Sequence, residues 1–304
     1  MAERRLPERQ EVLSYLRERR NWGRWGRDDE VGAVNLITAE KRLGAAALVR
    51  TGRTVSLSRE FPTTPGAGNP QPSQQWMKIV PRGTGGFAAD FYGTYYHGWA
   101  STHVDALCHT WDEHGMWNGR DPAREITFEG ARFGGVHRWK DGIITRGLLL
   151  DVPRHRGEPY VRQEGPVHGW ELEEIAKAQG VTVEPGDAVC VYSGREAWQA
   201  AHPDRPYGPE PRPGLHASCL PFLRDHDVAV LAWDMMDLTP NGYDLPWSVH
   251  AAIFAYGVAL IDNALLEPLN RVCAEERRWD FMLILAPLRV VGGTGSPANP
   301  IAMF

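Results

Sequence analysis

The stretch that decides the fold runs from His97 to His109 and reads His97-Gly-Trp-Ala-Ser-Thr-His103-Val-Asp105-Ala-Leu-Cys-His109. His103 and Asp105 are two residues apart, so both side chains leave the same face of an extended strand. If the chain turns helical after this strand, Asp105 and His109 lie one turn apart and are neighbours again. The spacing therefore predicts a strand and a following turn that gather imidazoles around one carboxylate.

Such a cluster has the donors that a divalent metal needs. Imidazole nitrogen and carboxylate oxygen suit zinc, manganese or iron better than calcium or magnesium. The alternative is that the histidines are satisfied by hydrogen bonds within a loop and that Asp105 caps a turn. Four of the 11 histidines lie in or just after this stretch, at positions 97, 103, 109 and 114, and this density favours a metal site.

The composition, 42% hydrophobic and 23% charged, is typical of a soluble globular protein. A net charge of −5 over 304 residues gives no electrostatic basis for binding nucleic acid or an anionic membrane. The four cysteines form no Cys-x-x-Cys pair, so we expect reduced, buried thiols. The sequence starts without an apolar leader and has no apolar run of membrane-spanning length, so we expect a cytoplasmic protein. Some of the 12 tryptophans could form the aromatic walls of a small-molecule pocket.

Short apolar strands alternate with few helices along the chain, which predicts one α/β domain with a mixed sheet. Helices are predicted over 7–20, 38–50, 172–179, 213–226 and 250–256, and strands over 54–58, 87–99, 148–152, 187–194, 228–233 and 281–288. Residues 258–263 form a further apolar segment that closes on a carboxylate, and 62–75 read as an irregular loop. Residues 292–302 are predicted to be a glycine-rich loop that matches no nucleotide-binding pattern.

The segment from Thr102 to His109 resembles the His-x-Gly-Thr-His-x-Asp-x-Pro-x-His signature of the metal-dependent cyclase family, which includes bacterial kynurenine formamidase and isatin hydrolase. Weaker matches follow in sequence order at 142–151, 213–215, Asp234, His250, 260–263 and 292–297. The resemblance covers most of the chain and fits the branch of roughly 300 residues. It implies a barrel-like mixed sheet with flanking helices, the swivelling β/β/α arrangement. Residues 1–60 would be an N-terminal helical extension with the first strand, and 61–304 the metal-hydrolase core of the same domain.

The resemblance also implies roles for individual residues. His103 and Asp105 would be metal ligands, and His109 the acid/base that moves protons. His250 would be the downstream ligand, and Asp262, twelve residues later, stands where the family has a glutamate.

Two departures from the family pattern affect the metal site. The first signature histidine should lie where this chain has Trp99. His97 is two residues too early, so either it reaches the metal through a local bulge or that ligand is missing. Asp262 is one methylene shorter than glutamate and would have to sit closer to the metal. We therefore expect one firm site for zinc or manganese and leave a second metal site open.

The resemblance implies hydrolysis of a linear or cyclic amide, as in an arylformamidase, through metal-activated water. Trp99 is a candidate for stacking on an aryl substrate, although filling the core is an equally good reading. Ser193 and Arg195 are candidates for binding a substrate carboxylate. His216 is a weaker candidate, for which a structural role is favoured, and Asp234 stands at a strand end where substrates often bind.

Two other functions are compatible with the same residues. The first is a metal-dependent cyclase or lyase of secondary metabolism, which would close a ring or remove water. The second is a binding protein without activity that has lost the ligand at Trp99. A homodimer or homotetramer is implied by the resemblance, because relatives are commonly oligomeric.

Overall fold

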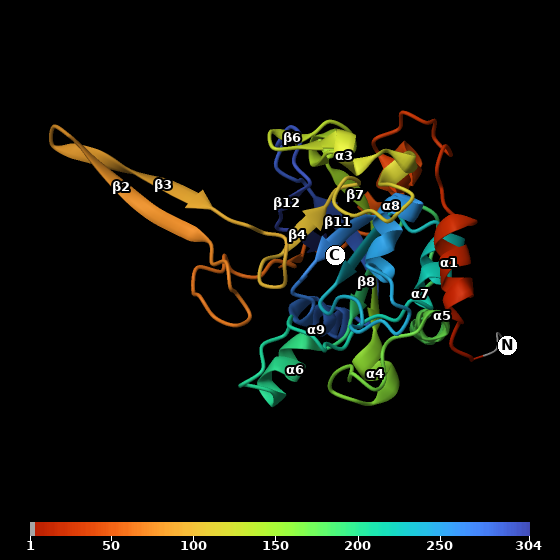
Figure 1. Ribbon diagram of the computed structural model, residues 1–304. Coiled ribbons are helices and arrows are strands. Elements are labelled where there is room, and N and C mark those ends of the chain that lie inside the picture. Colours follow the sequence, from red (N-terminus) through yellow and green to blue (C-terminus); the bar gives the residue numbers. More distant parts are fainter. Residues whose placement is uncertain (1–3) are drawn as a thin grey trace.

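A nine-stranded mixed sheet forms the centre of the computed structural model, which describes residues 4–304 (Figure 1). Its strands lie in the order β1 (Thr54–Ser56), β13 (Ile301–Met303), β11 (Asp280–Leu285), β7 (Ile143–Asp151), β8 (Ala188–Tyr192), β9 (Val230–Trp233), β10 (Ala259–Asp262), β4 (His103–Asp105) and β12 (Gly295–Pro297). The four central strands β7 to β10 run parallel, and the outer strands pair antiparallel.

The parallel strands are buried on both faces, which explains why they appear in the sequence as nearly continuous apolar runs. Helices connect each parallel strand to the next. α4 (Val152–Arg156) and α5 (Gly169–Gln179) connect β7 to β8, and α6 (Arg195–Ala201) and α7 (Cys219–Asp225) connect β8 to β9. The 3₁₀ turn η4 (Val249–Ala251) and α8 (Ala252–Tyr256) connect β9 to β10. Helix α9 (Glu267–Glu276) connects β10 to β11. α5 and α8 each end at a left-handed glycine, Gly180 and Gly257.

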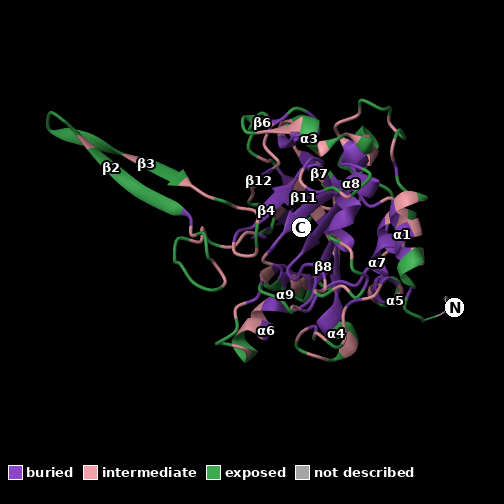
Figure 2. Ribbon diagram, viewed as in Figure 1, coloured by how far each residue is buried: buried purple, intermediate pink, exposed green. Residues whose placement is uncertain are grey.

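The strands of the main sheet are largely buried (Figure 2). Alternate residues of each parallel strand belong to two separate core clusters, one on each face of the sheet. Leu148 and Leu150 of β7 face the cluster that includes α5, α7, α8 and the N-terminal helix α1 (Arg9–Arg17). Leu149 faces the cluster that includes α9. Helix α2 (Ala39–Ala46) contacts β7 and β11.

Small elements complete the body. They are the 3₁₀ turns η1 (Gly32–Leu36), η2 (Trp117–Gly119) and η3 (Val136–Trp139), helix α3 (Pro122–Glu125) and the strands β5 (Ile126–Thr127) and β6 (Gly130–Ala131).

A hairpin of two nine-residue strands, β2 (Gln74–Arg82) and β3 (Gly85–Gly93), projects from the body as a long arm (Figure 1). The sequence pattern predicts a single strand over 87–99. In the structure this strand begins earlier, at Gly85, and ends at Gly93. It pairs with β2, a strand that the sequence pattern does not predict. A polar turn at 83–84 separates the two strands.

The predicted fold class is confirmed: a single α/β domain with a curled, mixed sheet and flanking helices. The expectation for the C-terminus is wrong, because β12 and β13 lie within 292–303 and belong to the main sheet, β12 as one edge strand and β13 between β1 and β11 near the other edge. Their pairing partners, β4 and β11, are distant in sequence, so local composition does not reveal them. Within residues 4–304, no helix is both long and apolar enough to cross a membrane.

Candidate metal centre

The register between β10 and β4 creates the core of the site. Asp262 lies directly opposite His103 on the neighbouring antiparallel strand, and the strand period places Asp105 on the same face of β4. All three side chains are buried, with Asp105 fully inaccessible. Strand β12 covers the other edge of β4, opposite the same two positions. This part of the sheet therefore holds two carboxylates and an imidazole away from solvent.

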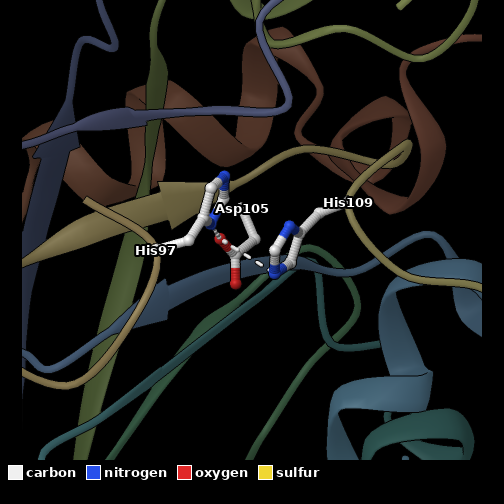
Figure 3. Close-up of side chains that lie close together, drawn as sticks. All are labelled: His97, Asp105 and His109. Atoms are coloured by element: carbon white, nitrogen blue, oxygen red, sulfur yellow. Dashed lines mark ion pairs between the residues drawn. The ribbon is translucent and has the colours of Figure 1, made fainter. Parts of the chain in front are cut away.

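Asp105 is at the centre of the first donor group, and three imidazoles surround it. His97 Nδ1 lies 2.9 Å from Asp105 Oδ1, His103 Nε2 lies 3.3 Å from it, and His109 Nε2 lies 3.9 Å from it. Figure 3 shows His97 and His109 on either side of the carboxylate, and their rings stack with centroids 3.8 Å apart. Among residues 4–304, neither oxygen of Asp105 has a partner for a hydrogen bond of good geometry. A buried carboxylate without such partners is costly unless a cation compensates it.

Asp262 is at the centre of the second donor group. Its Oδ2 lies 3.3 Å from His250 Nε2 and 3.8 Å from His103 Nε2, while Trp233 Nε1 donates to its Oδ1. His250 is brought to the site by η4. Its Nδ1 donates to Asp237 Oδ1 at 2.8 Å, so its Nε2 faces the site. His103 is oriented in the same manner, because its Nδ1 donates to Ser101 O at 2.9 Å.

These donors fit a divalent transition metal. Ligands at about 2.0–2.2 Å from a tetrahedral zinc lie roughly 3.3–3.6 Å from one another, and the nitrogen–oxygen separations around Asp105 and Asp262 span 2.9 to 3.9 Å. Among the described residues, the potential ligands divide into His97, Asp105 and His109, and His103, Asp105 and Asp262. A histidine that donates its second nitrogen to a carboxylate or a carbonyl is also typical of metal ligands.

The electrostatics of the cluster favour a cation. Burial disfavours charge on His103 and His250, yet Asp105 raises the pKa of His103, and Asp237 with Asp262 raises the pKa of His250 well above its usual value. Burial opposes the charge of Asp105 as well, but His109 and His103 hold its pKa well below the ordinary value. By contrast, burial lowers the pKa of His109 to about 4. The buried carboxylates therefore create a negative potential that a bound metal would neutralise.

His97 reaches the cluster from a loop. Gly98, which follows it, has φ +147°, and Gly295 on β12 leaves the space that the imidazole needs. A Cβ at Gly295 would meet Val104 O and lie 3.0 Å from His97 Cε1. The structure thus places this early histidine beside Asp105, whereas Trp99 contributes no ligand atom to either donor group.

Asn263, immediately after Asp262, holds the loop between His97 and His103. Its side-chain amide donates to Gly98 O at 2.6 Å and to Ser101 O at 3.3 Å, and its Oδ1 accepts from Arg195 Nη1 at 2.6 Å. Its own carbonyl accepts from Thr102 Oγ1. Sequence reasoning misses Asn263, since an asparagine after an apolar run carries no recognisable signal.

The other predicted residues lie around the cluster rather than in it. Arg195 is 8% exposed and donates to Trp99 O at 2.5 Å as well as to Asn263, so it is bound by protein groups. Asp234 accepts backbone N–H groups of Ser193 and Arg195 and thereby organises the start of α6. Ser193 Oγ is buried and has no hydrogen-bond partner in the described part of the chain.

His216 contacts a different part of the molecule. Its Nδ1 accepts from the backbone N–H of Ser218, and its Nε2 lies 3.0 Å from the hydroxyl of Tyr243. Neither neighbour belongs to the metal-binding groups. Asp237, in contrast, binds His250 directly.

Two hollows flank the histidines. A cavity of 430 Å³ is lined by His109 together with Trp111, Pro246 and Trp247. A smaller cavity of 130 Å³, lined by Tyr96, His97 and Trp99 among others, lies at the base of the arm. Trp247 lies close to both donor groups, with its ring centroid 6.5 Å from that of His109 and 5.4 Å from that of His250. The site can therefore be approached by a small molecule that contacts aromatic side chains.

The fold and the site together define a class of protein: a single α/β domain with a buried His/Asp cluster of metal-binding character on an outer strand of a curled mixed sheet. The chain belongs to the Cyclase family, whose model, described as "Putative cyclase", matches residues 54–240. The predicted family is confirmed.

Three known proteins are similar to this chain in sequence or in fold. A crystal structure of a novel cyclase has 29% identity and a TM-score of 0.83, covering 94% of this chain and 99% of that one. Isatin hydrolase A from Labrenzia aggregata bound to benzyl benzoate has a TM-score of 0.57 at 16% identity, covering 87% and 98%. Kynurenine formamidase from Bacillus cereus is 26% identical over 93 residues, which is 31% of this chain and 41% of that protein. The match to this curated relative thus spans less than half of its length.

Proposed function

We propose that this chain is a metal-dependent hydrolase that cleaves the amide C–N bond of a small aromatic or cyclic substrate. The observation that carries the proposal is Asp105: a fully buried carboxylate with no good hydrogen bond and three imidazole nitrogens within 3.9 Å. The names of the relatives, kynurenine formamidase and isatin hydrolase, support hydrolysis and an aromatic substrate.

The proposed ligands are His97, His103 and Asp105, with Asp262 and His250 forming the second group. Zinc or manganese suits this nitrogen and oxygen donor set. When bound, such a metal supplies a water nucleophile at neutral pH and an electrophile for the substrate carbonyl. One firm site fits the donors around Asp105, and the donors around Asp262 suit a second.

His109 is proposed to move the proton. Its Nε2 is the farthest of the three imidazole nitrogens from Asp105 Oδ1, and its side chain, 20% exposed, lines the larger cavity where substrate would bind. At this position it can take the proton from the attacking water and deliver it to the leaving nitrogen. Trp247 and Trp111 would pack against an aryl group in the cavity and exclude bulk water.

Three further proposals concern the cellular compartment, the oligomeric state and the domain boundaries. Four buried, unpaired cysteines support a reducing compartment, and we place the protein in the cytoplasm. We also propose a homodimer or homotetramer. The domain boundaries expected from the sequence, 1–60 and 61–304, remain a proposal, with β1 and β13 joining the two parts.

A second candidate reaction is ring closure or dehydration at the same metal, which the family description as a cyclase supports. Hydrolysis in ¹⁸O-labelled water transfers one labelled oxygen to the product, whereas dehydration transfers none. Aryl formamides, isatin and lactones form the substrate panel.

The decisive experiment combines elemental analysis with turnover of this panel. We expect His103→Ala and Asp105→Ala to lose the metal, and His109→Ala to keep it and lose turnover. His114→Ala, in the exposed turn five residues after His109, is the matched control and should change neither quantity. Wild-type protein with less than about 0.2 metal per chain would contradict the proposal, as would full activity of His109→Ala.

A further inference from the structure

The cavity beside His109 has acidic and aromatic walls, and none of the described residues that line it is a lysine or an arginine. The lining residues are His109, Thr110, Trp111, Asp112, Glu113, Pro246 and Trp247. The volume of 430 Å³ lies in the range of small-molecule sites. A molecule in this cavity therefore meets two carboxylates and two indole rings, with no cationic side chain among them.

Asp112 is the lining carboxylate without an ion pair in the part of the chain that the structure describes. Its Oδ1 accepts from the backbone N–H of His114 at 2.8 Å, a contact that leaves its charge unbalanced. Glu113 pairs with Arg17 of α1 at 2.5 Å, but the Glu113 side chain is 71% exposed, so water screens this pair. This wall of the cavity therefore keeps an excess of negative charge.

Thr110 gives an independent sign that the cavity takes a polar ligand. The residue is 1% exposed and lines the cavity directly after His109. Its Oγ1 has no hydrogen-bond partner within residues 4–304. A buried hydroxyl without a partner costs free energy, and a polar group of a bound molecule would remove that cost.

We propose that this cavity selects an aryl amide whose aromatic part carries an ammonium group. Asp112 and Glu113 would specify the positive charge, and Thr110 Oγ1 would hydrogen-bond to the amide. The faces of Trp111 and Trp247 suit the same ligand, because an indole ring attracts a cation over its face and also packs on an aryl ring. The inference rests on the proposed hydrolase function and names the substrate class of that site.

A substrate with a carboxylate fits the cavity less well. Arg195, the buried arginine near the metal-binding groups, donates to Trp99 O and Asn263 Oδ1 and does not line the cavity. A divalent metal would be balanced by the charges of Asp105 and Asp262, so its presence would leave the acidic wall uncompensated. A substrate carboxylate would then face like charges without a cationic partner.

The test compares three formanilides that differ in one meta substituent: N-(3-aminomethylphenyl)formamide, N-(3-hydroxymethylphenyl)formamide and N-(3-carboxyphenyl)formamide. For compounds that are hydrolysed the readout is kcat/KM, and for compounds that are not it is Kd by isothermal titration calorimetry. We expect the ammonium compound to be preferred over the hydroxymethyl compound by about five- to tenfold, as for one screened ion pair with a cation–π contact. The carboxylate compound should be the poorest, and 0.5 M NaCl should reduce the preference.

Substitutions in the wall separate charge from structure. Asp112→Asn keeps an acceptor for the His114 N–H and should lower the ammonium preference at least about threefold. Glu113→Lys, at an exposed side chain, should move the preference toward the carboxylate compound by at least about tenfold, which a purely structural role would not do. Thr110→Val keeps the shape of the side chain and should weaken all three compounds to a similar extent. Asp204→Asn is the matched control, because this exposed aspartate lies outside the cavity, and it should leave the preference unchanged.

Four results would overturn the proposal. They are equal use of the ammonium and hydroxymethyl compounds by the wild type, a preference for the carboxylate compound, a wild-type preference in Asp112→Asn, and no binding of any of the three compounds at 10 mM. Circular dichroism confirms that each variant is folded. Preferential binding of the ammonium compound without hydrolysis would contradict only the proposed hydrolase, whereas hydrolysis of all three compounds without preference would contradict only the substrate class.

Discussion

Replacing Asn263 by alanine tests whether the loop between His97 and His103 is held from outside the cluster. The Asn263 side chain makes three hydrogen bonds, two to the carbonyls of Gly98 and Ser101 and one from Arg195. Ser101 O in turn accepts from His103 Nδ1. Asn263→Ala therefore removes the hydrogen bonds that hold the loop between His97 and His103, and it leaves every proposed ligand unchanged.

The cost can be worked out from these contacts. The hydrogen bond from the buried Arg195 is worth about 1.5–3 kcal/mol, and each amide bond to a carbonyl about 1 kcal/mol. Asn263 has φ +53°, and alanine in this left-handed region costs roughly 1 kcal/mol more. Since neighbouring losses overlap, we expect the free energy of unfolding to fall by about 3–5 kcal/mol. Metal affinity should fall by about 10- to 100-fold, as when other groups that orient ligands are removed.

Urea unfolding measures the first quantity, and competition with a chromophoric chelator measures the second. Asn263→Gly removes the same hydrogen bonds but tolerates the positive φ, so it separates the side-chain contribution from backbone strain. Asn21→Ala is the matched control: this buried asparagine also donates to a carbonyl, Tyr256 O, and accepts from an arginine, Arg24. It should lose stability and keep the metal. Wild-type metal affinity in Asn263→Gly would refute the reasoning.

Three further predictions concern single contacts. Asp237→Asn removes the carboxylate that orients His250 and should weaken metal binding by about 10- to 100-fold in the chelator assay; unchanged affinity would show that η4 alone places the imidazole. Gly295→Ala puts a methyl group against Val104 O and His97 and should lower both the melting temperature and the metal content, whereas Gly44→Ala in α2, with open space around its Cβ, should lower neither. Burial and His168 lower the pKa of His216 to about 4, below the value of about 6.5 in the unfolded chain. Because the unfolded chain takes up this proton first, the stability contributed by neutral His216 is complete above about pH 6.5 and is lost as the pH falls toward 4. His216→Asn keeps an acceptor for the Ser218 N–H but has no group that titrates in this range. Between pH 7 and pH 4 the free energy of unfolding of the variant should therefore fall less than that of the wild type. The expected difference between the two falls is roughly 2–3 kcal/mol.

The strand that carries the site shows how far sequence reasoning reaches. The two-residue spacing of His103 and Asp105 predicts a shared strand face, and β4 has this geometry. The apolar runs predict the buried parallel strands, of which β8 and β9 lie within the predicted ranges. The predicted family, and with it the α/β fold, follows from this short motif and the order of weaker matches.

Other features depend on residues far apart in the chain. The partner of β3 is β2, whose Lys78, Pro81 and Arg82 hide the strand pattern, so the arm is not foreseen. Strand β12 contains glycine and proline and exists because β4 offers an unpaired edge. The role of Asp237 becomes visible only when η4 brings His250 within 2.8 Å of it.

The sequence by itself determined the family, the type of fold and which residues of one short strand face the same side, because the two-residue period of extended backbone is a local property. The tertiary structure alone decided that Asp262 lies opposite His103, that His97 reaches Asp105 despite its early position, and that Asn263 and Arg195 hold the intervening loop. These arrangements depend on strand register and loop packing between segments up to 165 residues apart, as for Asn263 and Gly98, and no local pattern encodes them.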